Sequence, residues 1–288
     1  MYYSIKKRLI SHPGCAMEYL RRFVAHRRWA CPHCGCVGKP HRHSVTQKKV
    51  VIYQCSHCNK TFSELYGTIF HKSKIPISKW MLGIIEWMES TGSVSASELQ
   101  RKLNISYPSA WKMFMKIRKF LSEMSQDNDL LKNVVEGDEA WFGKKDNQDI
   151  VLGLVERGRR KMKLICIPNV KEETLLPLVE EYVKKGSKFF TDQHIGYVAT
   201  QVYYQHQTTC HSKGQFAKKT QTDNVHSNTI EQIWGDIKGI IRTIHHGISK
   251  KYRRFYFAQY IFKYQFIHST NLFFKTLSTL FTPRYCLY

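Results

Sequence analysis

Acidic residues gather in one apolar stretch of an otherwise basic chain. The run VVEGDEAWFGKK, residues 134–145, holds Glu136, Asp138 and Glu139. Burying a carboxylate costs free energy unless a cation, a proton or several hydrogen-bond donors compensate it. The run predicts a strand in which Glu136 and Asp138 point to one face and Glu139 to the other. We therefore expect a positive charge beside this strand.

Two later segments supply acids that could join Asp138. Asp192 ends a short predicted strand, SKFFTD, and meets Asp138 at one edge of the sheet if the two strands are neighbours. Glu231 lies in the helical pattern HSNTIEQIWGDIKGIIR, with Lys238 seven residues later on the same face and Asn228 one turn earlier. Oxygen ligands suit Mg²⁺ or Mn²⁺, and two such ions can promote phosphoryl transfer. Taken singly, each acid is more often a surface or turn residue.

Four of the nine cysteines form two close pairs, Cys31-Pro-His-Cys34 and Cys55-Ser-His-Cys58. Two C-x2-C turns at this separation are typical of a tetrahedral, four-thiolate Zn²⁺ site. Disulfides and unpaired buried thiols are the alternatives, and neither accounts for the paired spacing. The sequence therefore predicts a zinc ribbon, a unit so small that the metal must supply much of its stability.

A helical segment follows the cysteines. Apolar residues recur at spacings of three and four in SKWMLGIIEWMES and again in the stretch ending KMFMKIRKFL. One helix is expected to end near Leu103 and a second to start at Ser106 or Tyr107 after a short turn. A helix-turn-helix would place the second helix in a major groove, whereas the alternative is a plain helical hairpin between domains. The basic residues of the second helix expected to contact DNA are Lys112, Lys116 and Arg118.

The formal net charge of +23 and the pI near 9.7 indicate a polyanionic partner, either nucleic acid or anionic lipid. The aromatic-rich C-terminal segment is interrupted by polar residues such as Lys263, so it lacks the roughly 18 consecutive apolar residues of a spanning helix. The N-terminal MYYSIKKRLISHPG lacks the apolar run of a secretory signal. We therefore expect DNA as the partner, no membrane, and a cytoplasmic, nucleoid-associated location.

The region around the acids predicts a mixed α/β domain. Strands are predicted in NVVEGDEAWFG, DIVLGLVERG and KMKLICIPN, followed by an amphipathic helix that stops at Gly186 and a fourth strand ending at Asp192. The polar run SEMSQDNDLLKN is interpreted as a linker. The predicted organisation is a zinc ribbon at 1–70, a helix-turn-helix-like segment at 71–121, a linker at 122–133 and an α/β domain with C-terminal helices at 134–288.

These motifs follow one another in a specific order: C-x2-C, C-x2-C, a helical segment, V-E-G-D-E, a strand ending T-D, H-S-x-G, and N-x-I-E-x-x-W-x-x-x-K. In this order the chain resembles the bacterial insertion-sequence transposases that carry an N-terminal zinc ribbon and an ISXO-like DDE catalytic domain. The resemblance implies a ribonuclease H-like, integrase-type mixed-sheet core. That core would follow the ribbon and the helix-turn-helix-like segment.

The resemblance also implies roles for individual residues. The family's two aspartates fall on Asp138 and Asp192, and its glutamate falls on Glu231. These three would bind catalytic Mg²⁺ or Mn²⁺. Asn228 also matches, and some relatives use Asn in place of the third acid, so either Asn228 or Glu231 completes the site.

Other residues would support that site or bind DNA. The family's trailing lysine falls on Lys238, which we expect, with Arg242 of the same helix, to contact DNA. Glu136 shares a face with Asp138 and either assists the metals or binds a partner in the core.

The expected function is that of a transposase acting on double-stranded DNA. It would bind the terminal inverted repeats, hydrolyse the end phosphodiester to release a 3′-hydroxyl, and direct that hydroxyl at target DNA. Because two ends must be paired, a homo-oligomer on DNA is expected. The alternatives are a catalytically inactive DNA-binding derivative, acting as a regulator or persisting as a relic, and a structure-directed nuclease of the same fold.

Overall fold

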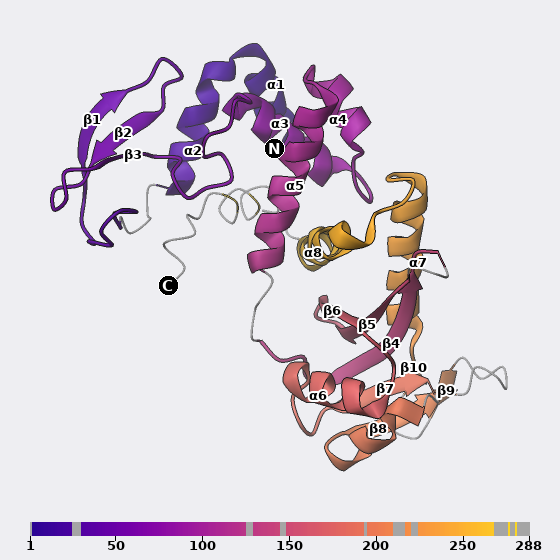
Figure 1. Ribbon diagram of the computed structural model, residues 1–288. Helices are drawn as coiled ribbons and strands as arrows, with labels where there is room; N and C mark the ends of the chain where they lie inside the picture. Colours follow the sequence, from indigo (N-terminus) through magenta and orange to yellow (C-terminus); the bar gives the residue numbers. More distant parts are fainter. Residues whose placement is uncertain are drawn as a thin grey trace. The chain divides into compact units, whose positions relative to one another are not determined.

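The computed structural model describes residues 2–24, 30–124, 129–144, 148–192, 195–209, 217–219, 224–267, 276 and 280. The chain divides into two compact units, Met1–Phe120 with His268–Tyr288, and Leu121–Ile267 (Figure 1). The division falls within helix α5 (Tyr107–Met124). That helix continues into the segment predicted as a linker, of which residues 125–128 lie outside the described part, as does the H-S-x-G motif at 211–214.

Two helices that the sequence analysis did not predict precede the ribbon. These are α1 (Tyr2–Ser11) and α2 (Ala16–Val24), joined by the short 3-10 helix η1 (Pro13–Cys15), and both helices pack against α3 (Ile77–Glu89). Leu9 of α1 is fully buried. The positions predicted as the start of a zinc ribbon are therefore helical, because a single apolar face is enough to dock a short helix despite its many basic residues.

The ribbon is an antiparallel sheet of three strands, β1 (His41–Val45), β2 (Val51–Gln54) and β3 (Thr61–Ser63), in that order. Every residue of β1 is exposed, so its sequence HRHSV carries no apolar alternation and gave no strand signal. Glu64, just after β3, is buried and accepts hydrogen bonds from the Val51 N–H at 2.7 Å and from Arg21 Nε at 3.0 Å. Glu64 thereby ties the ribbon to α2.

The predicted pair of helices forms α4 (Ala96–Leu103) and α5. The Ser95 hydroxyl caps α4 by accepting a hydrogen bond from the Glu98 N–H at 3.1 Å, and Asn104 ends the helix in the left-handed region at φ 47°. The predicted helix end near Leu103 and the predicted start of α5 are both confirmed.

The second unit is built on a five-stranded mixed sheet in the order β6-β5-β4-β7-β8. β4, β5 and β6 pair antiparallel, and β7 and β8 continue the sheet parallel to β4. This combination of order and direction is the ribonuclease H-like arrangement, so the expected fold class is confirmed. The strands are β4 (Val134–Phe142), β5 (Asp149–Glu156), β6 (Lys161–Ile167), β7 (Lys188–Asp192) and β8 (Gln205–Thr209).

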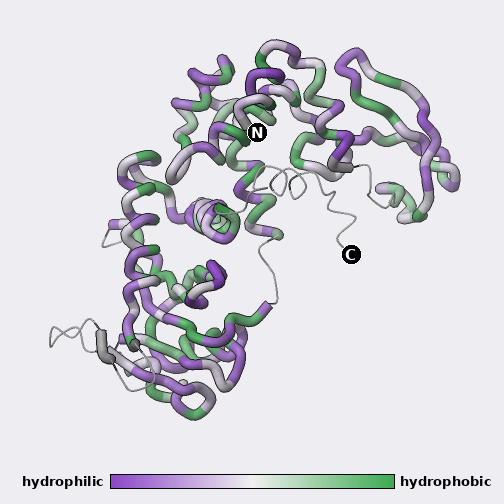
Figure 2. Tube along the Cα trace, turned by 180° about the vertical axis from the view of Figure 1, so that it is seen from behind, coloured by the Kyte–Doolittle hydropathy of each residue, from purple (hydrophilic) through white to green (hydrophobic). Residues whose placement is uncertain are grey.

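Helices cover both faces of this sheet (Figure 1). α6 (Glu172–Tyr182) and the 3-10 helix η3 (Ile195–Val202) lie on one face, and α7 (Asn228–Thr243) and α8 (Lys250–Phe266) lie on the other. Residues of β5 alternate between the two apolar cores, which explains its nearly unbroken hydrophobic run. Figure 2 shows this hydrophobic content along the strands. A short hairpin, β9 (Ala217–Lys219) with β10 (Asn224–His226), leads into α7.

Of the expected C-terminal helices, the described part of the aromatic-rich segment forms α8, while most of the residues after 267 lie outside the described part. Arg253 of α8 is buried and donates from Nη1 to the Phe142 carbonyl oxygen at 2.6 Å and to Asp149 Oδ2 at 2.7 Å. These bonds fasten α8 to the end of β4 and the start of β5. No helix in the described part of the chain is long and apolar enough to cross a membrane.

We expect Gly153→Ala to lower the free energy of unfolding by about 1–3 kcal/mol, because a Cβ there would lie 2.4 Å from Trp234 Cζ2 and 2.7 Å from Ile230 Cδ1 of α7. Urea denaturation measures the change. Gly239→Ala is the matched control: no atom lies within 4 Å of its added Cβ. That control should be neutral or stabilising because Ala favours helix over Gly. Equal stability of the Gly153 variant and the wild type would contradict the packing of α7 on β5.

Candidate active site and metal centre

Asp138 and Asp192 stand opposite each other at one edge of the sheet. β4 and β7 run parallel, and their last paired residues are Glu136 and Phe190. Asp138 and Asp192 each lie two positions farther along, where the two strands part. Because side chains alternate along a strand, both acids lie on the face that Glu136 occupies. We expected Asp138 and Asp192 to meet if their two strands were neighbours. β4 and β7 are neighbours, so the two acids do meet.

The environment of Asp138 opposes its negative charge. Burial, followed by the nearby charges of Glu139 and Asp192, raises the pKa of Asp138 to about 7. A hydrogen bond from Trp234 Nε1 to Asp138 Oδ2, at 3.0 Å, acts in the other direction. A divalent cation would relieve both the desolvation and the repulsion, so these oxygen donors fit Mg²⁺ or Mn²⁺.

Glu139 belongs to the same group of charges although it lies on the other face of β4. It is 8% exposed, and the Tyr197 hydroxyl of η3 donates a hydrogen bond to its Oε1. Burial and the charge of Asp192 raise the pKa of Glu139 to about 7. We assigned Glu139 no role from the sequence. Its position next to Asp138 was the one feature of the sequence that could have placed it near the site.

Glu231 is half-buried in the first turn of α7, and its Oε1 accepts a hydrogen bond from the Ser227 hydroxyl at 2.6 Å. Asp138, Asp192 and Glu231 do not form a group whose ligand atoms all lie within 4.8 Å of one another, since no such group of three carboxylates occurs among the described residues. Asn228, one turn earlier, is exposed. The structure thus brings the two aspartates together. The Glu231 side chain is instead hydrogen-bonded to Ser227, the residue just before its own helix.

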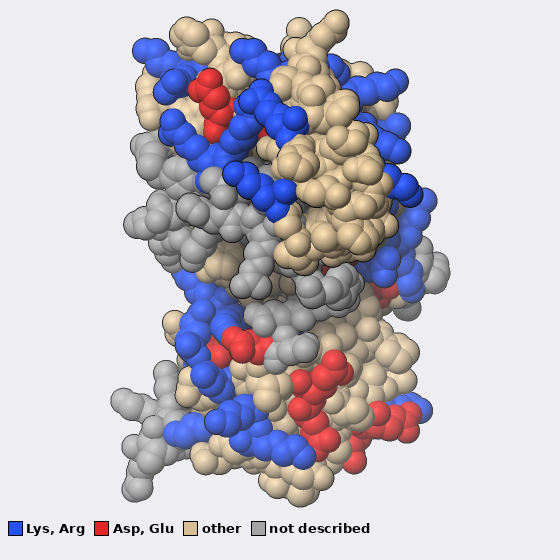
Figure 3. Space-filling view, turned by 90° about the vertical axis from the view of Figure 1, so that its left-hand side faces the viewer, with Lys and Arg blue, Asp and Glu red and all other residues tan. Residues whose placement is uncertain are grey.

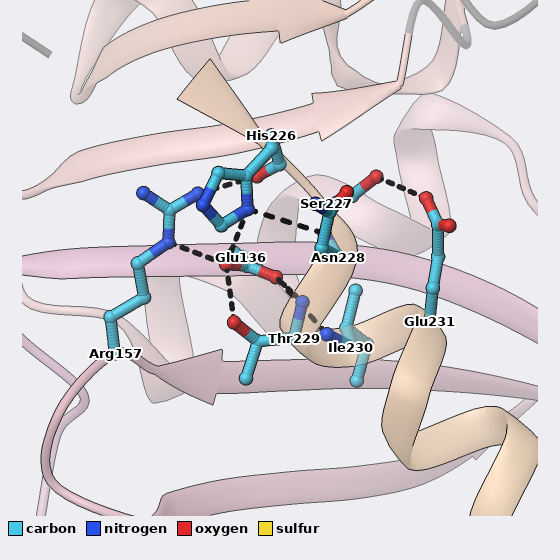
Figure 4. Close-up of polar contacts among 8 residues, drawn as sticks. All are labelled: Glu136, Arg157, His226, Ser227, Asn228, Thr229, Ile230 and Glu231. Carbon is cyan, nitrogen blue, oxygen red and sulfur yellow. Dashed lines mark hydrogen bonds and ion pairs between the residues drawn. The ribbon is translucent and has the colours of Figure 1, made fainter. Parts of the chain in front are cut away.

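Glu136 is fully buried and hydrogen-bonded to donors from other elements. Arg157 approaches one of its oxygens, and the start of α7 approaches both (Figure 4). Of the two roles expected for Glu136, metal support or binding a core partner, the structure shows the second.

The four predicted cysteines form a compact cluster. Ligand atoms of Cys31, Cys34, Cys55 and Cys58 all lie within 4.8 Å of one another, with Sγ–Sγ distances of 3.6 Å and 3.8 Å across the two turns. In each turn a backbone N–H points at the first sulfur: those of His33 and His57 donate at 3.4 Å. This is a four-sulfur donor set of the kind that holds Zn²⁺.

One residue expected to contact DNA on α5 is misplaced for that role. Arg118 is 2% exposed: its guanidinium lies over the Phe114 ring, 5.2 Å from the centroid, and donates to Met115 Sδ at 3.8 Å. The prediction for Arg118 is wrong because this position lies on the packed face of α5, where a long side chain can bury its stem.

The other basic candidates are exposed. Lys112 and Lys116 lie on the exposed side of α5, although Lys116 Nζ also donates to the Ile69 carbonyl oxygen at 3.4 Å. Lys238 and Arg242 are exposed on α7 and, with Glu231, follow one face of that helix. Figure 3 shows Lys and Arg side chains on many parts of the face it presents, with fewer Asp and Glu.

Comparison with known proteins agrees with this geometry. Residues 130–265 match the ISXO2-like transposase domain family. A protein of Halobacterium salinarum described as "Uncharacterized protein in transposable element ISH50" is 26% identical over 148 residues, which is 47% of this chain and 47% of that protein. The chain therefore spans about half the length of this curated relative.

Two viral structures are also similar to parts of the chain. The HTLV-2 integrase catalytic core domain in complex with magnesium, in its dimeric form, is 12% identical with a TM-score of 0.33, covering 47% of this chain and 88% of that one. The simian T-cell lymphotropic virus intasome in complex with PP2A regulatory subunit B56 gamma is 12% identical with a TM-score of 0.32, covering 59% and 64%.

The family match covers the strands that carry both aspartates and the helix that carries Glu231, and the four-cysteine ribbon precedes it. Residues 130–265 therefore match an ISXO2-like transposase domain, and the four-cysteine cluster precedes that domain in the chain.

Proposed function

We propose that this chain is a DDE-type transposase that binds the terminal inverted repeats of an insertion sequence, cleaves DNA with divalent metal ions, and joins the released 3′-hydroxyl to target DNA. The observation that carries the proposal is the register of β4 and β7, which sets Asp138 opposite Asp192 within an ISXO2-like transposase domain. Two half-buried acids that repel each other are costly in a fold unless they bind a cation.

Asp138 and Asp192 would hold Mg²⁺ or Mn²⁺, with Glu231 or Asn228 completing the donor set. Such ions activate an attacking oxygen and stabilise the leaving oxygen of a phosphodiester. The protein's part is to position the carboxylates and the DNA. Trp234 orients Asp138 through its 3.0 Å hydrogen bond, and the parallel pairing of β4 with β7 sets the separation of the two acids.

DNA would lie along the exposed basic residues. Lys238 and Arg242 follow Glu231 along one face of α7, so phosphates bound there would lie beside the acids. Lys112 and Lys116 of α5 would hold the terminal repeat, and the four-cysteine ribbon would fold around Zn²⁺. Two ends must be joined together, so the active form would be a homo-oligomer on DNA.

The first prediction concerns chemistry. Asp138→Asn and Asp192→Asn should each slow cleavage and joining of labelled terminal-repeat DNA on the order of 10²-fold or more, because a metal ligand supplies several kcal/mol of transition-state stabilisation. Strand-transfer assays in Mg²⁺ and in Mn²⁺ measure both products. Asp236→Asn is the matched control, since Asp236 is an exposed acid elsewhere on α7.

The wild type decides between the proposal and its alternatives. Repeat binding with no product in either metal would identify a DNA-binding regulator or relic. Cleavage without joining would identify a nuclease.

A second prediction concerns stability. The pKa of Asp138 rises from its ordinary 3.8 to about 7 in the folded protein, so the folded state binds more protons than the unfolded state between these values. Metal-free protein should therefore lose stability as the pH rises through this window, and Asp138→Asn should reduce the loss. Thermal unfolding in EDTA from pH 5 to pH 8 tests this. At pH 8, Mn²⁺ should raise the wild-type Tm and leave that of Asp138→Asn nearly unchanged. A variant as pH-sensitive and as Mn²⁺-responsive as the wild type would contradict the assignment.

A third prediction concerns the ribbon. Removing Zn²⁺ with a chelator, or replacing Cys34 with Ser, should unfold the ribbon, because so small a sheet depends on its metal. Metal analysis should find about one Zn²⁺ per chain bound by four thiolates. Cys36→Ser is the control, since Cys36 is exposed and lies outside the cluster. A ribbon that keeps its hydrogen-exchange protection after chelation would exclude a structural metal.

A further inference from the structure

Glu136 lies two residues before Asp138 on the same face of β4, yet its contacts are of a different kind. Its Oε2 accepts hydrogen bonds from the backbone N–H groups of Thr229 at 2.9 Å and Ile230 at 3.0 Å. Its Oε1 accepts from the Thr229 hydroxyl at 2.8 Å and from Arg157 Nε at 2.5 Å (Figure 4). Both oxygens are thus occupied by donors from the protein itself.

The two N–H groups belong to the first turn of α7, where backbone donors have no partner within the helix. The residue before a helix usually caps them, but Ser227 makes no such bond. Its hydroxyl donates instead to Glu231 Oε1 at 2.6 Å. The Glu136 carboxylate of β4 therefore caps α7. Ser227, which occupies the usual capping position, bonds Glu231 instead.

Neighbouring groups complete this arrangement. The Asn228 N–H donates to His226 Nδ1 at 3.3 Å, so the first-turn donors of Asn228, Thr229 and Ile230 all have partners. Burial together with the Arg157 charge lowers the pKa of His226. The same Nδ1 lies 3.4 Å from Glu136 Oε1, so His226 also contacts the buried carboxylate.

Arg157 supplies the positive charge that the buried Glu136 needs. Its Nη2 also donates to the His226 carbonyl oxygen at 2.6 Å, which fastens the end of β10 to the same guanidinium. The positive end of the α7 dipole adds to this compensation. The Glu136 carboxylate is thus stabilised without a metal ion, unlike Asp138.

We propose that Glu136 is a positioning residue: it caps α7 in place of Ser227, so that the Ser227 hydroxyl holds Glu231 as the third carboxylate of the metal site. The inference rests on the proposed function. In this role Glu136 affects metal binding only by positioning Glu231. If Glu136 were itself a metal ligand, its effect would not depend on Glu231.

Mn²⁺ binding to the full chain, followed by electron paramagnetic resonance, separates these two roles. Glu136→Gln and Ser227→Ala should each weaken Mn²⁺ binding by roughly 10-fold, as loss of a residue that orients a ligand does. In a Glu231→Gln background, neither substitution should weaken binding further. Additive effects of the Glu136 and Glu231 substitutions would overturn the inference and make Glu136 a ligand.

Glu156→Gln is the matched control. Glu156 is also buried in this sheet, but its partners lie outside α7: it accepts hydrogen bonds from Asn133 Nδ2 at 3.0 Å and from the Lys132 N–H at 3.3 Å. It should lose stability in EDTA with Mn²⁺ affinity unchanged. A Glu136→Gln variant that behaves in the same way would reduce Glu136 to an ordinary core residue and overturn the inference.

Two further readouts keep the test decisive. Hydrogen exchange at the Thr229 and Ile230 amides should speed up in Glu136→Gln and stay unchanged in Ser227→Ala. If Glu136→Gln does not fold, Ser227→Ala alone and with Glu231→Gln carries the test, because it removes one hydroxyl. A wild type that binds no Mn²⁺ overturns the proposed function, whereas a wild type that binds Mn²⁺ with additive variant effects overturns only this inference.

Discussion

The parallel pairing of β4 with β7 is the constraint on which the candidate site depends. These strands are far apart in sequence, separated by two antiparallel strands and α6. The pairing is possible because the central sheet is covered on both faces, one core containing α6 and η3 and the other containing α7 and α8. Once the register is set, Asp138 and Asp192 must stand opposite each other. The meeting of the two acids at this edge is thus a consequence of how two apolar cores pack.

The acids of β4 meet the cost of burial in different ways. Glu136 has a guanidinium and backbone N–H groups, and Glu139 has the Tyr197 hydroxyl. Asp138 accepts one hydrogen bond, from Trp234 Nε1, and faces the negative charge of Asp192. The surrounding protein therefore offsets little of its negative charge. The pattern separates Glu136, whose charge meets donors of the protein, from Asp138, whose pKa is raised by burial and neighbouring acids. Type and spacing alone do not make this distinction, because all three are carboxylates in one strand.

The first unit is stabilised differently. The core of its ribbon consists of Cys31, Cys55 and Phe62, with a few partly buried neighbours. Such a core buries little apolar surface to offset the ordering of the chain, and the four-sulfur cluster could bind a metal ion that would add to it. The preceding helices pack against α3, and Glu64 joins the ribbon to α2. These contacts make residues 2–24 part of the helical layer.

Local patterns in the sequence were enough for much of this protein. The Cys31–Cys34 and Cys55–Cys58 spacings predicted the cluster, because each knuckle is a single turn whose geometry depends only on neighbouring residues. Alternation and helical periodicity predicted β4, β5, β6, β7 and α7, since each buries a regular face. The exposed β1 and the polar β8 escaped prediction because neither presents an apolar face along its own sequence.

Tertiary structure decided the rest, because partners distant in sequence determine it. Periodicity predicted that Arg118 lies in a helix. It did not predict that Arg118 is buried, because burial depends on the apolar side chains that pack around it. The juxtaposition of Asp138 with Asp192 needed the strand order. The role of Glu136 needed the start of α7, more than ninety residues away, to arrive beside its carboxylate. The sequence by itself determined which residues could do chemistry, and only the fold decided which of their charges are compensated by donors of the protein and which face another buried acid.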